Sequence, residues 1–277
     1  MRDFTDKVAA ITGAGSGIGR ALAFELAVCG GRLALSDVDE EGLAGTVAEV
    51  RARGAEVRGY PLDVADRAAV LAHAEDVVRD FGRVNLVVNN AGVALGATVA
   101  EMSFEDFDWL LGINLGGVVN GTKAFLPHLI ASGDGYVVNI SSAFGFVGVP
   151  TQSAYNAAKF AVRGFTESLR EEMLAIGHPV GVSCVHPGGI KTDIVRHARG
   201  GSGDDHEAVV SGFEKIALTT PKKAAETILR GVRRRSARIL IGPDAHVIDA
   251  IPRVLGSAYQ RPLAVLARPG LKRLGRN

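Results

Sequence analysis

The sequence predicts one large α/β domain whose parallel sheet is covered by helices on both faces. Three observations predict it. Short apolar runs rich in β-branched residues alternate with amphipathic stretches along the chain, a pattern typical of strands that alternate with helices. The strand runs are continuously apolar, as expected for strands buried on both faces of a sheet. The length of 277 residues suits a single domain with a sizeable core.

The elements follow one another in a regular order. Strands are predicted at residues 8–11, 32–36, 57–60, 86–89, 136–140, 180–185 and 238–241. Helices are predicted at residues 17–28, 40–53, 67–81, 104–125, 154–175 and about 222–234. Because crossovers between parallel strands are right-handed, these strands are expected to form one doubly wound, seven-stranded sheet.

Local signals support two of the helix starts. Ser103 stands three residues before Asp106, which is capping-box spacing. Thr220 precedes a proline, and proline is favoured at the first helical position. Two stretches do not follow this alternation of strands and helices, residues 193–215 and everything after Gly242.

Composition narrows the class of protein. The N-terminus has no signal-peptide core, and nowhere do 18 apolar residues run together. Cys29 and Cys184 lie far apart and outside any metal-ligand spacing, which favours a reducing cytoplasm. We expect no metal site, since the seven histidines show no ligand spacing either.

Charge is unevenly placed. Beyond Pro252 there are six basic residues and no acidic one, so the first 252 residues carry 25 basic against 30 acidic residues, a net of −5. An acidic body argues against a nucleic-acid surface.

A glycine-rich loop joins the first strand to the first helix. It reads Thr12-Gly-Ala-Gly-Ser-Gly-Ile-Gly19. Glycines at this place allow a tight turn and let the backbone approach a pyrophosphate, which the helix N-terminus favours. The loop therefore predicts a Rossmann-type dinucleotide site.

Asp37 ends the second strand, 18 residues after Gly19. A carboxylate there accepts hydrogen bonds from the adenosine ribose and repels a 2′-phosphate. Neither Ser16 nor Val38 offers a cation for that phosphate. We therefore expect NAD(H) rather than NADP(H).

A proton-transfer pair is predicted on the helix of residues 154–175. Tyr155 and Lys159 are four residues apart and share one helix face. An ammonium beside a phenol favours the phenolate and lowers the pKa of the tyrosine. Ser142, which follows the fifth strand by two residues, could hydrogen-bond and polarise a substrate oxygen.

Together these residues resemble the short-chain dehydrogenase/reductase family over residues 5 to about 242. Further matches to its motifs are Leu62-Asp63-Val64, Asn89-Asn-Ala-Gly92, Asn114 and Pro187-Gly-Gly-Ile-Lys-Thr192. The resemblance implies a catalytic set of Asn114, Ser142, Tyr155 and Lys159. It implies cofactor contacts from Gly13, Ser16, Gly17, Ile18, Gly19, Asp37, Asp63, Val64, Asn90, Ala91, Gly92, Tyr155, Lys159, Pro187, Gly188, Ile190 and Thr192.

The resemblance also suggests individual roles. Tyr155 would act as general base or acid, Lys159 would also hold the nicotinamide ribose, and Asn114 would position a water that links Lys159 to solvent. The segment 187–192 would meet the nicotinamide carboxamide. Asn89 and Asn90 are expected to brace strand ends, and His186, His197 and His206 to be solvated or structural. The implied assembly is a homodimer or homotetramer through the helices at 104–125 and 154–175.

The expected pocket segments are apolar. They comprise residues 93–95, 144–149 and 194–195, which favours an uncharged, hydrophobic secondary alcohol or ketone, although Arg196 and Arg199 could reach in. Small hydroxyketones and polyols stay open. Residues 193–215, with the run Gly200 to Asp205, suit a loop that orders over substrate. Residues 1–242 would thus form the NAD-binding and catalytic domain, with a lid at about 193–215.

The remaining residues, 243–277, form a basic and apolar extension. Pro262 and Pro269 would break any long helix there. The extension could pack on this or a neighbouring subunit, which we favour, or lie weakly on a membrane surface. Two other functions stay open for the whole chain, a catalytically idle nucleotide-sensing scaffold and an enzyme that uses bound NAD for epimerisation or elimination.

Overall fold

Seven parallel strands form one sheet in the computed structural model, which describes residues 1, 3–200 and 204–274. The strands are β1 (Val8–Thr12), β2 (Arg32–Asp37), β3 (Val57–Pro61), β4 (Leu86–Asn89), β5 (Gly135–Ile140), β6 (Val180–Pro187) and β7 (Arg238–Ile241). Their order is β3-β2-β1-β4-β5-β6-β7. From β1 the strands are added first toward β3 and then, starting with β4, on the opposite side of β1. Ligands bind at this switch point between β1 and β4 in folds of this kind. The predicted fold class is confirmed.

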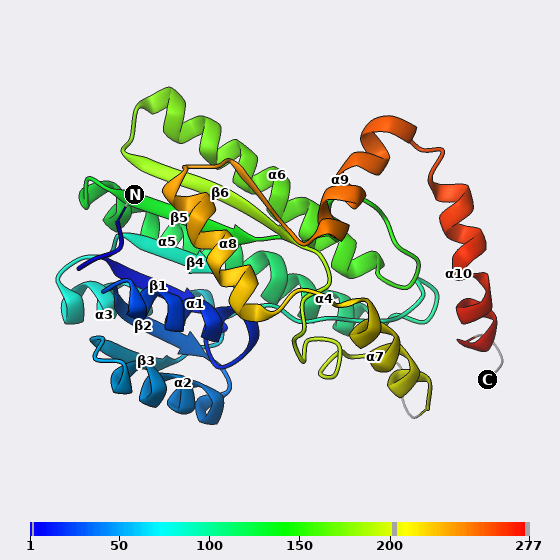
Figure 1. The fold of residues 1–277 in the computed structure, drawn as a ribbon, viewed down its shortest axis with the longest axis horizontal. Helices are drawn as coiled ribbons and strands as arrows, with labels where there is room; N and C mark the ends of the chain where they lie inside the picture. The colour runs from blue at the N-terminus through cyan, green and yellow to red at the C-terminus, as the bar shows by residue number, and fades with distance from the viewer. Residues whose placement is uncertain (2, 201–203, 275–277) are drawn as a thin grey trace.

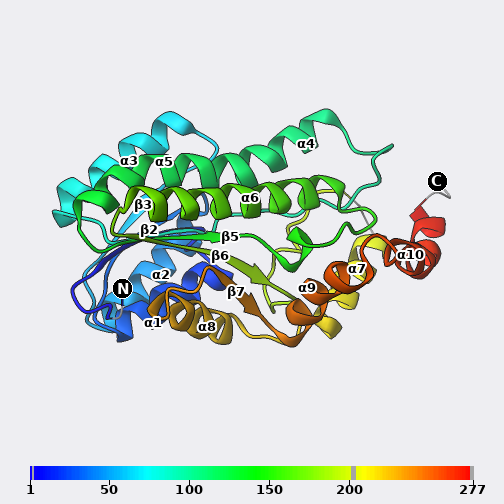
Figure 2. The ribbon, with the colours of Figure 1, turned by 90° about the horizontal axis from the view of Figure 1, so that it is seen from above.

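Helices cover both faces of the sheet (Figure 2). One face carries α1 (Gly17–Val28), α2 (Glu40–Ala52) and α8 (Pro221–Arg233). The other carries α3 (Arg67–Phe81), α4 (Phe104–Leu111), α5 (Gly117–Ala131) and α6 (Ser153–Ile176). Beyond one end of the sheet lie α7 (Asp204–Ile216), α9 (Pro243–Leu255) and α10 (Gln260–Leu274), and α10 stands away from the body (Figure 1).

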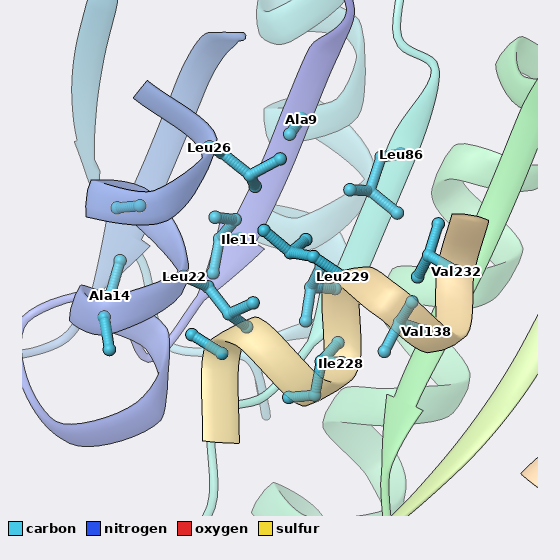
Figure 3. Packing of buried hydrophobic residues seen from close by; sticks show 14 of the residues in the cluster. Ala9, Ile11, Ala14, Leu22, Leu26, Leu86, Val138, Ile228, Leu229 and Val232 are labelled. Atoms are coloured by element: carbon cyan, nitrogen blue, oxygen red, sulfur yellow. The ribbon is translucent and has the colours of Figure 1, made fainter. Parts of the chain in front are cut away.

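The core is built from branched aliphatic side chains on both faces. Figure 3 shows Leu22 of α1 and Leu229 of α8 packed over Ile11 of β1, all at most 3% exposed. Each such side chain contributes about 1.5–3 kcal/mol when it leaves water. Val87 and Phe125 belong to a second cluster beneath α3, α5 and α6. Two packed faces hold the strand ends, and therefore the loops that follow them, in fixed positions.

The caps form as predicted. The Asp106 N–H donates to the Ser103 hydroxyl at 3.0 Å, and the Lys223 N–H donates to the Thr220 hydroxyl at 3.2 Å. These bonds satisfy backbone donors that have no partner within the helix.

The helix predicted over residues 104–125 differs in one respect. A π turn, η1 (Gly112–Gly116), separates α4 from α5, and α5 continues to Ala131 with Pro127 inside it. A π turn places one extra residue in a helical turn and is frequent at functional sites. Here the buried residue of the turn is Asn114.

Two expectations need revision, one for residues 193–215 and one for the extension at residues 243–277. The predicted loop at 193–215 is helical from Asp204 onward as α7, while residues 201–203 of the predicted flexible run lie outside the described residues. The expectation that prolines break the C-terminal extension is wrong. Pro262 lies in the first turn of α10, where its missing N–H costs no helical bond, and Pro269 lies inside the helix without ending it.

No helix among residues 1, 3–200 and 204–274 is both long enough and apolar enough to cross a membrane.

Candidate active site

Four segments that carry sequence-predicted site residues lie at the carboxyl ends of β1, β4, β5 and β6. The glycine loop follows β1, the Asn89–Gly92 segment follows β4, Ser142 follows β5 and the Pro187–Thr192 turn follows β6. Because the strands are parallel, these segments lie at the same edge of the sheet, around the switch point in strand order between β1 and β4.

The glycine loop has the shape of a phosphate cradle. Gly13 and Gly17 have φ values of +64° and +51°, a conformation that favours glycine. A Cβ atom on Gly19 would overlap the Gly13 carbonyl oxygen. Ser16 precedes α1, a helix of 12 residues, without making a side-chain capping bond to its first N–H groups. Such a terminus suits the pyrophosphate of a dinucleotide.

Asp37 lies against this cradle. Its Oδ2 atom accepts from the Gly15 N–H at 2.7 Å and its Oδ1 atom accepts from the Asp39 N–H at 3.0 Å. These two bonds fix the carboxylate at the end of β2 and leave it further acceptor capacity for hydroxyl groups. The Arg20 side chain donates to the Gly15 carbonyl and, at 3.0 Å, to the Thr46 hydroxyl, so it braces the loop from behind.

Asn90 ties β4 to the glycine loop. Its Nδ2 atom donates to the carbonyl oxygens of Thr12 and Gly13 at 2.9 and 3.1 Å. Asn89 instead donates to the Asn139 side chain at 2.8 Å. Both asparagines therefore brace strand ends, as the sequence suggested. On the other side of the cradle, Asp63 accepts from the Ala65 N–H at 2.9 Å.

Ser142, Tyr155 and Lys159 form the candidate catalytic group. Tyr155 is half-buried and packs edge-on against Phe144, with ring centroids 6.4 Å apart. The Lys159 ammonium lies 5.5 Å from the centroid of the Tyr155 ring and donates to the Ile140 carbonyl at 3.0 Å. The Ser142 side chain lies close enough to the phenol to influence its pKa, and its hydroxyl accepts from the Phe144 N–H at 3.1 Å. A serine, a tyrosine and a lysine thus lie close together, with the Lys159 ammonium next to Gly92.

The pKa values in this group have clear physical causes. Burial lowers the pKa of Lys159 to about 8, a value at which the ammonium is still mostly charged at neutral pH. Burial raises the pKa of Tyr155, and the hydrogen bond to Ser142 opposes the rise. In the protein without its cofactor the pKa of Tyr155 is therefore raised, because the loss of solvation outweighs the effect of Ser142.

Asn114 supports the group through its place in the π turn. Its Oδ1 atom accepts from the Val93 N–H at 2.8 Å, and its Nδ2 atom donates to the Val93 carbonyl at 2.9 Å. A Cβ atom on Gly92 would lie 3.2 Å from Asn114 Oδ1 and 3.6 Å from Lys159 Nζ. Asn114 and Lys159 thus border the same small space beside Gly92.

His186 is a site residue whose contacts sequence reasoning missed. It is fully buried at the end of β6, and its Nδ1 atom lies 2.9 Å from the carbonyl oxygen of Ser142. Its ring stacks on Phe146 with centroids 4.2 Å apart. Burial lowers the pKa of His186 to about 4, so the neutral ring donates through Nδ1 to the backbone of the candidate catalytic serine. In the sequence, the one indication that His186 belongs to the site is that it directly precedes the Pro187–Thr192 motif.

The Pro187–Thr192 turn spans the distance from β6 to the glycine loop. The Gly188 N–H donates to the Ile241 carbonyl at 2.9 Å, and the Lys191 N–H donates to the Thr219 carbonyl at 2.9 Å. A Cβ atom on Gly17 would lie 3.2 Å from the Thr192 methyl group, so the end of the turn faces the cradle.

Arg199 does not line the pocket as an anion-binding residue. Its guanidinium pairs with Asp106 at 3.1 Å and lies 3.8 Å from the centroid of the Trp109 ring. Its backbone pairs with that of Leu95 in a short bridge. Arg196 in turn pairs with Asp193 at 3.4 Å. Both arginines therefore have acidic partners of their own.

Within the part of the chain that the structure describes, no three His, Cys, Asp or Glu side chains lie close enough to hold a metal ion.

A family profile described as short chain dehydrogenase matches residues 7–202. The chain belongs to this family. Short chain dehydrogenases are oxidoreductases that use a nicotinamide cofactor, and the cradle, Asp37 and the Pro187–Thr192 turn fit such a group.

Two curated relatives and one solved structure illustrate the relationship. The oxidoreductase SadH of Mycobacterium tuberculosis is 56% identical, over 95% of this chain and 96% of its own. C alpha-dehydrogenase of Sphingobium sp. is 36% identical, over 88% of this chain and 83% of its own. A short chain dehydrogenase from Burkholderia phymatum, solved in complex with NAD, is 33% identical with a TM-score of 0.85, covering 92% of this chain and 95% of that one.

Proposed function

We propose that this short chain dehydrogenase interconverts a secondary alcohol and a ketone by hydride transfer, with NAD(H) as its cofactor. The observation that carries the proposal is the proximity of Ser142, Tyr155 and Lys159 to one another, with Lys159 next to Gly92. The other residues of the proposed site are the cofactor contacts predicted from the sequence and Asn114.

Each side chain has a role that its chemistry suits. Tyr155 takes the hydroxyl proton of an alcohol, or returns it to a ketone, as general base or acid. Ser142 donates to the substrate oxygen and polarises it. Bound NAD supplies the hydride acceptor and a positive charge near the phenol. Lys159 adds its own positive charge, and both charges offset the burial that raises the tyrosine pKa.

The preference for NAD rests on Asp37. The carboxylate is fixed by the Gly15 and Asp39 N–H groups, so it could not turn away from a 2′-phosphate without losing both bonds. A negative charge held there repels the phosphate of NADP and accepts from the hydroxyls of NAD.

The substrate is proposed to be uncharged and fairly hydrophobic. Leu95, Phe146 and Val147 are buried in the segments that would line the pocket, and both nearby arginines are engaged elsewhere. One relative is named for dehydrogenation at a carbon atom, C alpha, which accords with an alcohol substrate. In this proposal residues 1–242 form the catalytic domain and 193–215 its lid.

Assembly and location are also proposals. Phe104 on α4 and Phe160 on α6 are 90% and 41% exposed, and such side chains suit burial in a homodimer or homotetramer in the cytoplasm. Val254 and Leu266 of the extension are also well exposed beside Arg253, Arg261 and Arg268. A weak contact with an anionic membrane surface is a second candidate role for residues 243–277. Co-sedimentation with anionic vesicles, with and without residues 252–277, tests it.

A panel of secondary alcohols and ketones, monitored by NADH absorbance, tests the main proposal. We expect stoichiometric NADH formation with at least one hydrophobic secondary alcohol. Binding of NADH without turnover of any substrate would favour an idle nucleotide-sensing scaffold. Product formation without net NADH release would instead favour epimerisation or elimination.

A further inference from the structure

The first turn of α9 reaches back to the Pro187–Thr192 turn. Asp244 lies in that first turn, and its Oδ2 atom accepts from the Gly189 N–H at 2.6 Å. The bond joins residues 55 positions apart in the sequence. A hydrogen bond to a carboxylate is short and roughly twice as strong as one between neutral groups. The C-terminal extension therefore begins with a direct contact to the candidate cofactor site.

Two glycines make room for this carboxylate. A Cβ atom on Gly188 would overlap both carboxylate oxygens of Asp244. Gly242, with φ of +91°, is equally close, since a Cβ atom there would overlap Oδ1. The carboxylate is thus enclosed between the turn that follows β6 and the turn that follows β7, and it has little freedom to move.

The Pro187–Thr192 turn, which Asp244 holds at Gly189, ends at the glycine loop. Beyond Gly189, the Lys191 N–H bonds to Thr219, and the Thr192 methyl group faces Gly17. The path from the extension to the cradle is therefore short: Asp244 holds Gly189, and Thr192 lies three residues further on. A shift of Gly189 would move Ile190 and Thr192 relative to the cradle.

We propose that Asp244 is a positioning residue that fixes the Pro187–Thr192 turn for the nicotinamide end of the cofactor. This inference rests on the proposed function, in which Ile190 and Thr192 contact that end. The adenosine end lies at Asp37, on the other side of the glycine loop, and Asp244 makes no contact there. The proposal extends the functional unit past Gly242, into the first turn of α9.

The test compares two ligands on the full chain. Asp244→Ala removes the acceptor, so we expect the Kd for NADH to rise about tenfold or more, equivalent to about 1.4 kcal/mol. ADP-ribose carries the adenosine and pyrophosphate but lacks the nicotinamide, and its Kd should change by less than about twofold. Titration calorimetry measures both constants without any need for turnover.

Asp249→Ala is the matched control. Asp249 lies on the same helix and pairs with Arg238 and Arg253, each at 3.1 Å, but does not contact the turn. It should leave both Kd values within about twofold of wild type. Asp244→Asn keeps a neutral acceptor, should weaken NADH binding less than alanine, and serves as the test variant if Asp244→Ala does not fold.

Either of two results would overturn the positioning role. One is wild-type affinity for NADH in Asp244→Ala, and the other is an equal loss of NADH and ADP-ribose. Both results leave the proposed function standing, because they concern one side chain. Failure of the wild-type protein to bind NADH would overturn the proposed function and this inference together.

Discussion

The site depends on single side chains that hold backbone rather than substrate. Asp37 fixes the glycine loop through Gly15, Asn90 fixes it through Thr12, and His186 fixes the carbonyl of Ser142. A proton and a hydride must both move along fixed directions, so small displacements of the reacting groups are costly. In the proposed reaction we therefore expect residues of this kind to influence rate and specificity without touching the substrate.

Asp37 determines the choice of cofactor in this account. Asp37→Ser should raise the ratio of kcat/KM for NADPH to that for NADH by at least about tenfold, because it removes the charge that repels the 2′-phosphate. Asp39→Ser is the control, since serine can still accept the Gly42 N–H that Asp39 caps. An unchanged ratio in Asp37→Ser would show that selectivity lies elsewhere.

Asn114 is expected to support both stability and rate. Asn114→Ala leaves the Val93 N–H and carbonyl without their partner, which should cost about 1–3 kcal/mol of unfolding free energy. Turnover should fall as well, because the side chain borders the space beside Lys159. Urea unfolding and steady-state kinetics measure the two effects. Full stability with full activity would contradict the role given to the π turn.

At the scale of elements, the C-terminal helices differ in how firmly they join the body. Asp249 of α9 pairs with Arg238 of β7, and Asp244 holds the turn after β6. The contact of α10 with the body is slighter. The Gly148 N–H donates to the hydroxyl of Tyr259, just before α10, at 3.3 Å, and a shallow hollow separates α10 from residues 148–156. The first turn of α9 thus contacts the turn after β6 directly, whereas the α10 region reaches the body at Gly148.

Truncation tests this difference. A chain that ends at residue 256 lacks α10 and should bind NADH with a Kd within about threefold of wild type. A chain that ends at residue 242 also lacks Asp244 and should lose at least tenfold in NADH affinity. Thermal unfolding of both chains serves as the folding control. Equal affinity in the two truncated chains would contradict a role for the first turn of α9.

Much of this architecture could be predicted from the sequence, for reasons that are local. The glycine loop, the caps at Ser103 and Thr220, and the Tyr155–Lys159 pair depend on residues a few positions apart. His186 and Asp244 could not be found in this way, since their partners are 44 and 55 positions distant. The direction of the Tyr155 pKa depends on burial, which local spacing does not reveal.

At the scale of the whole molecule, two buried histidines make stability depend on pH. Burial lowers the pKa of both His73 and His186 to about 4. His73 lies between the rings of Tyr60 and Phe125, at 4.7 and 5.7 Å. Between about pH 6.5 and 4 the unfolded chain binds more protons than the folded one, so the free energy of unfolding falls as pH falls through this window.

We expect each histidine to cost roughly 2 kcal/mol of stability between pH 6.5 and 5. Urea unfolding across this range measures the slope. His73→Phe should remove about half of the contribution of the two histidines to this slope. A slope that is the same in His73→Phe and in wild type would contradict this origin of the pH dependence.

In the proposed reaction Tyr155 transfers the proton that accompanies the hydride. The most direct measurement is turnover and NADH binding of Tyr155→Phe, with an alcohol that the wild-type enzyme oxidises. We expect a loss of kcat of at least about 10³-fold, within the range of general acid–base catalysis, with a Kd for NADH close to wild type. Tyr60→Phe, which removes a hydroxyl that donates to Asp80 at 2.8 Å, should keep full activity. Substantial turnover by Tyr155→Phe would contradict the account.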